Sequence, residues 1–109
     1  MTPEQVVSRQ LEAYNAHDLE GFCACYADDA SLRNFHEPKP YAVSKAEMRA
    51  IYGQRFSNPG LKARIAKRIA QGRYVIDQEE VEGLGDKILH VIAIYEVADG
   101  LIKSVSFIR

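Results

Sequence analysis

The sequence has no tryptophan, only two cysteines and almost no net charge. Its 14 lysines and arginines are offset by 15 aspartates and glutamates, so its formal charge at pH 7 is −1. Such a balance provides no electrostatic field that would attract a phosphate backbone or an anionic lipid surface. No apolar run approaches the roughly 18 to 20 residues that cross a bilayer. We therefore expect neither a nucleic acid nor a membrane as a partner.

The two cysteines point to no redox or metal chemistry. Cys23 and Cys25 lie two residues apart in a helical pattern, where their side chains point to different faces and cannot bridge each other. They form no Cys-x-x-Cys motif and no Cys/His ligand set, so we expect two small apolar side chains in a reducing compartment. The first residues also lack the pattern of an export signal. We predict a cytoplasmic protein without a metal site.

Other common motifs of catalysis are missing as well. There is no glycine-rich phosphate loop and no Gly-x-Ser-x-Gly motif, so we expect no cofactor. Among the three histidines, His36 lies beside Glu37 in a proline-containing loop and could act as an acid or base. A solvated His36 side chain is the preferred interpretation.

Capping patterns place the predicted helices in the first half of the chain. The segments Thr2 to Gln5 and Ser44 to Glu47 match the capping-box pattern, and Asp18 is a suitable N-cap for a short helix between them. That short helix is expected to reach Tyr26, and a turn at Ala27-Asp28-Asp29 should follow it. Alternating and turn-bounded patterns predict strands over residues 30–35, 61–70, 73–81, 87–97 and 101–109.

This order of elements predicts a single α+β domain over residues 1–109. The last four strands follow one another with short connections, so they should form an antiparallel meander. One face of such a meander must be covered, and the predicted helices all come before it. We expect three N-terminal helices packed in a strongly curved, mainly antiparallel sheet.

Three stretches of the sequence resemble a known family. They are Leu11-Glu12-Ala13-Tyr14-Asn15-Ala16-His17-Asp18-Leu19-Glu20-Gly21-Phe22, Tyr26-Ala27-Asp28-Asp29-Ala30 and Asp99-Gly100-Leu101-Ile102-Lys103. They are similar to the SnoaL-like group of the nuclear transport factor 2 fold, which includes steroid isomerases. The resemblance implies a cone made by a bent sheet around helices, a pocket between them, and frequently a homodimer formed through the sheet. Folds of this kind host many functions, so the pocket residues must identify the reaction.

The resemblance also implies where a steroid isomerase would hold its catalytic groups. That enzyme uses a carboxylate as base, and a tyrosine and a protonated carboxylic acid bind the oxyanion. The base position falls on Asn34, the acid position on Ala93 and the oxyanion tyrosine position on Gln10. Only the supporting tyrosine is matched, by Tyr52. We therefore expect no steroid isomerisation by that mechanism.

The first hairpin of the meander carries four opposite charges. A two-residue turn at Gln71-Gly72 would place Arg64 opposite Glu79 and Arg68 diagonal to Asp77 on one face. The preferred interpretation is an exposed ladder of cross-strand ion pairs. Inside a cleft, the same carboxylates could instead act as bases or bind a polar ligand, although a nearby arginine weakens a carboxylate as a base.

The second hairpin allows two registers. A two-residue turn at Asp99-Gly100 would pair His90 with Arg109, whereas a three-residue loop with a glycine bulge would group Ala93 and Tyr95 with alternate residues of the last strand. The resemblance favours the second register for the pocket wall.

These observations support two hypotheses about function. In the first, a small organic molecule binds in an apolar pocket, and Asp77 or Glu79 moves a proton on a carbonyl compound, as in isomerisation, hydration or elimination. The predicted ligand-binding residues are Tyr14, Asn34, Tyr52, Arg68 and Tyr95. In the second hypothesis, the protein is a non-catalytic dimeric binding module, whose cone is filled by side chains and whose functional surface is the sheet. We expect a homodimer through the sheet face.

Overall fold

The computed structural model describes residues 1–109 as three helices and one five-stranded sheet. In chain order the elements are α1 (Pro3–Asn15), α2 (Leu19–Cys23), β1 (Tyr26–Asn34), α3 (Lys45–Arg55), β2 (Lys62–Gln71), β3 (Tyr74–Glu82), β4 (Leu89–Ala98) and β5 (Leu101–Ile108). The strands lie in the order β1-β5-β4-β3-β2. Strands β2 to β5 pair in antiparallel fashion and β1 runs parallel to β5, which confirms the α+β class.

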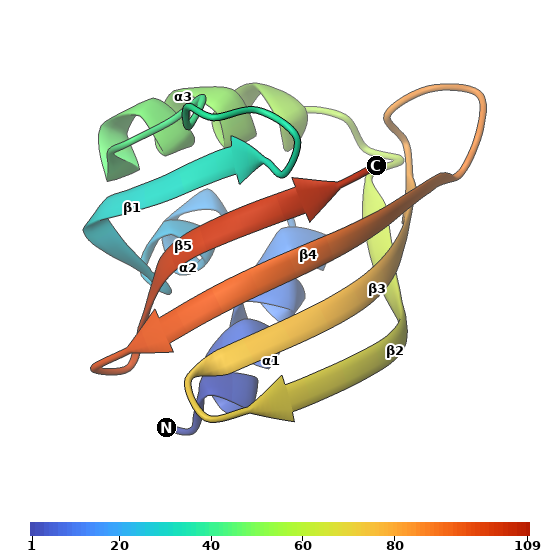
Figure 1. Cartoon of the computed structure of the whole chain (residues 1–109). Coiled ribbons are helices and arrows are strands. Elements are labelled where there is room, and N and C mark those ends of the chain that lie inside the picture. Colours follow the sequence, from blue (N-terminus) through green and yellow to red (C-terminus); the bar gives the residue numbers. More distant parts are fainter.

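The sheet curves around the helices, which cover its concave face. Figure 1 shows α1 and α2 behind the sheet and α3 along the edge formed by β1. The expectation of three N-terminal helices is matched in part, because α2 has only five residues, while a strand, β1, lies between α2 and α3 as expected. None of the helices has both the length and the hydropathy needed to traverse a bilayer.

The helices begin where their capping residues lie. The Thr2 side chain accepts a hydrogen bond from the Gln5 backbone N–H at 3.2 Å, and the Gln5 side chain accepts one from the Thr2 N–H at 2.8 Å. Asp18 caps α2 by accepting from the Gly21 N–H at 3.0 Å, and Ser44 caps α3 in the same way. These contacts satisfy backbone N–H groups in the first turn of each helix, which have no carbonyl partner within the helix.

The predicted boundary between the second helix and the first strand is wrong. Helix α2 ends at Cys23, and β1 starts at Tyr26, before the expected turn at Ala27-Asp28-Asp29. That segment is an irregularity within the strand. Tyr26 pairs with Ile102 of β5, whose N–H donates to the Cys25 carbonyl at 2.8 Å. A partner some 75 residues later along the chain therefore overrides the local helical pattern.

The predicted register of the first hairpin is also wrong. Its turn residues are Gly72 and Arg73, and Gly72 has a φ of 58°, which favours glycine. A bulge in β2 then shifts the pairing. Arg68 lies directly opposite Asp77 on the face toward the helices, whereas Arg64 pairs with Glu80 on the outer face. The four charges do not form one exposed ladder.

The second hairpin combines features of both predicted registers. Asp99 and Gly100 form a two-residue turn with φ angles of 56° and 74°. A shift between Glu96 and Val97 then moves the pairing by one residue. Ala93 consequently pairs with the buried Phe107, which confirms the inward-facing group predicted from the second register.

An aromatic cluster fills the narrow end of the fold beneath α3. Phe22 lies at its centre, with ring centroids 4.6 Å from Tyr52 and 5.1 Å from Tyr26. Tyr14 and Phe56 pack against each other at 5.3 Å in an edge-on arrangement. Offset and edge-on geometries of this kind are favourable beyond the area they bury. The cluster packs α1, α2, α3 and β1 against one another. Its three tyrosines are Tyr14, Tyr26 and Tyr52.

Candidate functional site

A cavity lies between the concave face of the sheet and the helices α1 and α3. Its inner space is about 40 Å³, room for roughly one water molecule, and its mouth is open to solvent. Eleven of its 15 lining residues are hydrophobic. The polar residues and tyrosines in its wall are Gln10, Tyr14, Tyr26, Tyr52, Arg55, Glu79, Tyr95 and Arg109. A mainly apolar hollow with a few convergent polar groups is the usual form of a small-molecule site.

Glu79 is the one carboxyl group in the cavity wall. It is only 8% exposed, because β3 alternates and turns every second residue, including Val75, Asp77 and Val81, toward the helices. The hydroxyl of Tyr95, on the neighbouring strand β4, lies 3.2 Å from Glu79 Oε2. Unlike Asp77, Glu79 has no ion-pair partner.

Tyr95 connects Glu79 to helix α1. The Tyr95 hydroxyl lies 3.5 Å from Gln10 Oε1 and 3.2 Å from Glu79 Oε2. A hydroxyl has one proton, so Tyr95 can donate to only one of these oxygens at a time. When Glu79 is ionised, Tyr95 can donate to the carboxylate. When Glu79 is protonated, its own O–H can donate to Tyr95, which is then free to donate to Gln10. The arrangement therefore accommodates both protonation states of Glu79.

Burial changes the acidity of Glu79. Desolvation, followed by the negative charge of Asp77, raises the Glu79 pKa from 4.5 to about 7, and the Tyr95 hydrogen bond and Arg68 oppose the rise. A carboxyl group with a pKa near the working pH can both take up and release a proton at useful rates. Glu79 is therefore suited to general acid–base chemistry.

Replacing Tyr95 by Phe should raise the Glu79 pKa above about 7, because the Tyr95 hydrogen bond lowers that pKa. NMR titration of the side-chain carboxyl carbon of Glu79 would measure the shift. Tyr74→Phe is the matched control, because Tyr74 is exposed on the other face of the sheet. An unchanged Glu79 pKa in the Tyr95 variant would show that this hydrogen bond does not stabilise the carboxylate.

Asp77 and Arg68 form a closed ion pair beside the cavity. Arg68 donates to both Asp77 oxygens, at 2.6 and 2.8 Å, and to the Ser8 hydroxyl of α1 at 2.6 Å. Asp77 is 1% exposed, and neither charged residue of the pair lines the cavity. A carboxylate whose two oxygens are held by one guanidinium is poorly disposed to accept another proton. The pair instead ties β2 and β3 to α1.

Two tyrosine hydroxyls of the wall are free to bind a ligand. Those of Tyr26 and Tyr52 have no hydrogen-bond partner in the protein, yet no fully buried side-chain polar atom lacks a partner. The hydroxyls must therefore open on the cavity that both residues line. Burial raises the pKa of both phenols, so they stay protonated and can donate to an oxygen atom.

The mouth of the cavity is lined by arginines and by the loop between β3 and β4. Arg55 comes from the last turn of α3, Arg109 follows β5, and Leu84 belongs to the loop. The side-chain oxygen of Asn34 accepts a hydrogen bond from Arg109. Asn34 does not itself line the cavity, so it acts on the site through Arg109.

The structure gathers most of the predicted site residues in or beside the cavity. Four of the seven predicted residues line it, namely Tyr14, Tyr52, Glu79 and Tyr95. The other three lie outside the lining, Asp77 and Arg68 as an ion pair and Asn34 behind Arg109. Sequence reasoning missed Tyr26 and Arg55 as wall residues. Arg55 follows Tyr52 by three residues, a spacing that places both on one face of a helix and could have identified it.

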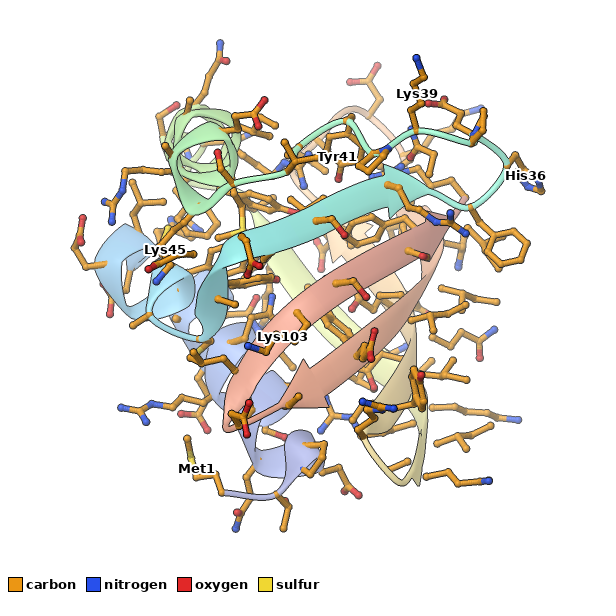
Figure 2. The ribbon with its side chains drawn as sticks, turned by 60° about the vertical axis from the view of Figure 1, so that its left-hand side comes forward. Met1, His36, Lys39, Tyr41, Lys45 and Lys103 are labelled. Atoms are coloured by element: carbon orange, nitrogen blue, oxygen red, sulfur yellow. The ribbon has the colours of Figure 1, made fainter.

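The histidines lie away from the cavity wall. His17 Nε2 is 2.8 Å from the Leu61 carbonyl and joins the turn after α1 to the start of β2. Figure 2 shows His36 at the tip of the loop after β1, pointing away from the sheet, and it is exposed. No three His, Cys, Asp or Glu side chains lie close enough together to hold a metal ion.

The profile of the SnoaL-like domain matches residues 7–105, which is nearly the whole chain. The chain belongs to the SnoaL-like family. This membership accounts for the bent sheet and the hollow between sheet and helices, and it confirms the resemblance carried by the three sequence stretches. No functionally curated protein matches this SnoaL-like chain.

Solved structures show the same fold. An uncharacterised cystatin-fold protein from Novosphingobium aromaticivorans superposes with a TM-score of 0.90 at 25% identity, covering 100% of this chain and 99% of the other. A proposed ketosteroid isomerase from Kribbella flavida gives a TM-score of 0.83 at 20% identity, covering 96% and 75%. An epoxide hydrolase from M. tuberculosis gives 0.80 at 16% identity, covering 96% and 80%. The last two likenesses show the fold alone.

The positions that the resemblance assigned to steroid isomerase groups carry no acid or base in this SnoaL-like domain. Ala93 is fully buried on the concave face, and the Gln10 side-chain oxygen lies 3.5 Å from the Tyr95 hydroxyl. Asn34 is held between Glu37 and Arg109 outside the cavity lining. The acid–base group of the cavity is instead Glu79, which lies on β3 rather than on β1 or β4.

Proposed function

We propose that this SnoaL-like domain binds a small carbonyl compound in its cavity and transfers a proton on it, with Glu79 as the acid–base group. The observation that carries this proposal is a buried, unpaired carboxyl group in an apolar cavity, with a pKa raised to about 7 by burial. Surface carboxylates ionise near pH 4 and are paired or solvated. A group tuned in this way is typical of a catalytic site.

The chemistry that we propose is the removal of a proton from a carbon next to the carbonyl group. The Glu79 carboxylate takes the proton, and the electron pair of the C–H bond moves onto the carbonyl oxygen as an enolate. The Tyr26 or Tyr52 hydroxyl donates a hydrogen bond to that oxygen. Protonated Glu79 then delivers that proton to another carbon, which completes an isomerisation, or first exchanges it with solvent and delivers a solvent proton to the same carbon, which completes an exchange.

We propose Glu79 rather than Asp77 as the base because Arg68 occupies both Asp77 oxygens. Asp77 and Arg68 then serve as positioning residues that hold β2, β3 and α1 around the cavity. The names of two structural neighbours, an isomerase and an epoxide hydrolase, are consistent with proton-transfer chemistry in this fold. They support the reaction class and leave the substrate open.

Incorporation of deuterium from heavy water into small ketones tests the proposal directly. Acetophenone and cyclohexenone carry exchangeable protons next to a carbonyl group, and ¹H NMR would follow their loss. We expect exchange faster than in buffer alone, and we expect binding of the same ketones to raise the melting temperature. Binding without faster exchange would favour the second hypothesis, a non-catalytic binding module.

We also propose that two copies associate through the convex face of the sheet. A shallow apolar hollow on that face is lined by Ile69, Tyr74, Ile76 and Ile94 together with Gln71. Ile69 and Tyr74 are 64% and 45% exposed, an unusual exposure for side chains of this size on one continuous face. A two-fold interface would bring this apolar patch of one copy against the same patch of the other.

Replacing Ile76 by Glu should convert the proposed dimer into a monomer, because it would bury two unpaired carboxylates across the two-fold axis. Light scattering coupled to size exclusion would measure the mass. The control is Gln78→Glu, which adds the same charge two residues further along β3, outside the hollow. A wild-type protein that is monomeric at micromolar concentration would rule out this interface.

We place the protein in a reducing compartment, consistent with the cytoplasm. Cys23 and Cys25 are free thiols, both buried. Burial raises the pKa of both thiols and so keeps them in the less reactive protonated form. Fractionation of the cells that produce the protein would test this assignment.

A further inference from the structure

Two arginines in the cavity wall have no carboxylate partner. Arg55 and Arg109 both line the cavity, and neither takes part in any of the five ion pairs of the protein. Arg55 lies over the ring of Tyr52, with its Cζ atom 4.7 Å from the ring centroid. Arg109 lies over Phe107 at 5.1 Å. Aromatic faces hold the two guanidinium groups, so most of their N–H donors are left unused.

The two arginines come from elements that converge at one end of the fold. Figure 1 shows the end of α3 and the end of β5 at the same side of the molecule, next to the loop between β3 and β4. Arg55 is half-buried and Arg109 is exposed at the mouth. Both guanidinium groups act on the Tyr14 hydroxyl, which lies in the same cavity wall. The two cations make this end of the apolar hollow positively charged.

The charge of the cavity is therefore positive in every protonation state of Glu79. Asp77 is already neutralised by Arg68, so Glu79 is the only acid that faces the two arginines across the cavity. With Glu79 ionised one positive charge remains, and with Glu79 protonated two remain. Glu79 lies within β3, whereas Arg55 is the last residue of α3 and Arg109 follows β5. The apolar residues of the same cavity wall include Val81, Val91 and Phe107.

We infer that the substrate is a small anion, an aromatic or alicyclic keto acid whose carboxylate binds Arg55 and Arg109 at the mouth. Guanidinium groups bind carboxylates through paired N–H donors, which suits a planar anion. The apolar body of the substrate enters from the open mouth, the inner space of about 40 Å³ widens to admit it, and its ketone points toward Glu79. The part of this inference that concerns the ketone rests on the function proposed above.

A purely structural role accounts for only one of the two arginines. Arg55 is in the last turn of α3, where a cation also stabilises the negative end of the helix. Arg109 comes from a different element and follows a strand, which has no comparable dipole. The side-chain oxygen of Asn34 accepts a hydrogen bond from Arg109. An anion that bridges both arginines accounts for the two positions together.

The test compares one compound in charged and neutral form. The probe is 3-benzoylpropionate, an aryl ketone with a carboxylate, and its methyl ester is the neutral counterpart. We expect the wild-type protein to bind the carboxylate roughly 10-fold or more tightly than the ester, measured by calorimetry at low salt. Arg55→Gln and Arg109→Gln should each remove most of that preference. Arg73→Gln should keep it, because Arg73 pairs with Glu96 on the hairpin outside the cavity lining.

The outcomes separate this inference from the proposed function. Equal binding of acid and ester, or an acid preference that survives in both cavity variants, would overturn the anion site. Deuterium exchange on the ester would then still support proton transfer by Glu79. A carboxylate preference that depends on the arginines, without exchange on either compound, would support the anion site and count against the reaction. If Arg55→Gln does not fold, the exposed Arg109 variant alone decides the result.

Discussion

Replacing Glu79 by Gln should slow proton exchange on a bound ketone by roughly 10²- to 10⁴-fold, the usual contribution of a positioned acid–base group. Glutamine keeps the shape of the side chain and can still hydrogen-bond Tyr95, but it cannot take up a proton. Exchange rates at saturating ketone, measured by NMR, would give the effect. Glu80→Gln is the control, because Glu80 is the next residue of β3 and pairs with Arg64 on the outer face. Equal rates for wild type and Glu79→Gln would exclude Glu79 as the base.

The same pKa predicts the pH dependence of the rate. Glu79 must be ionised to accept a proton from carbon, so exchange by the wild-type protein should rise with pH and level off above the Glu79 pKa of about 7. Tyr95→Phe should move this midpoint to higher pH. A rate that rises through pH 4 to 5 instead would indicate an ordinary solvated carboxylate as the base.

Glu79→Gln should also stabilise the protein, in contrast to its effect on the rate. The folded-state pKa of Glu79 is about 7 and its ordinary value is 4.5, so the folded protein binds more protons between these pH values. Stability of the wild type must therefore fall as pH rises through this window, by a total of about 3 kcal/mol. The glutamine variant avoids that loss, so it should be the more stable protein above pH 7 and show no advantage near pH 4. Urea unfolding at both pH values would measure this.

The elements that could be predicted from the sequence are those with local causes. The capping box from Thr2 to Gln5 brings together groups three residues apart, so short-range geometry determines where α1 begins. The turn at Asp99-Gly100 likewise depends on residues that tolerate positive φ. The start of β1 at Tyr26 could not be predicted in this way, because its partner Ile102 comes from the other end of the chain.

The part of the site that could be predicted from the sequence is the part that depends on the alternation of side chains along a strand. Period two places Glu79 and Tyr95 on inward faces once the sheet is oriented, but the pattern alone does not say which face is inward. The bulge in β2 was the decisive unknown, because it turns Arg68 toward α1 and Arg64 away from it. With the bulge, Arg68 reaches Ser8 of α1, a tertiary contact that spacing along the strand does not reveal.

Replacing Arg68 by Met should lower the free energy of unfolding by about 3 to 5 kcal/mol, the usual result of leaving a buried charge without its partner. Asp77 is 1% exposed and would lose both hydrogen bonds from the guanidinium, and α1 would lose its contact through Ser8. This loss is a large part of the total stability of a small domain. Denaturant unfolding of the full chain would measure it. Arg64→Met, on the exposed pair with Glu80, should change stability only slightly.

A double variant separates the loss of the pair from the loss of one partner. Arg68→Met combined with Asp77→Leu replaces the ion pair by apolar side chains, which often costs little in a buried position. We expect it to recover most of the stability lost by Arg68→Met alone. If both variants are equally unstable, the packing of the Arg68 chain or its bond to Ser8 matters more than the charge of Asp77.

The two variants should also move the acidity of Glu79 in opposite directions, which links the frame of the fold to its chemistry. Asp77 raises the Glu79 pKa more than Arg68 lowers it. Removing Arg68 alone should therefore raise the Glu79 pKa, and removing both charges should lower it below about 7. The midpoint of the exchange rate against pH should follow the same order. Midpoints that do not move while stability changes would show that the ion pair supports only the fold.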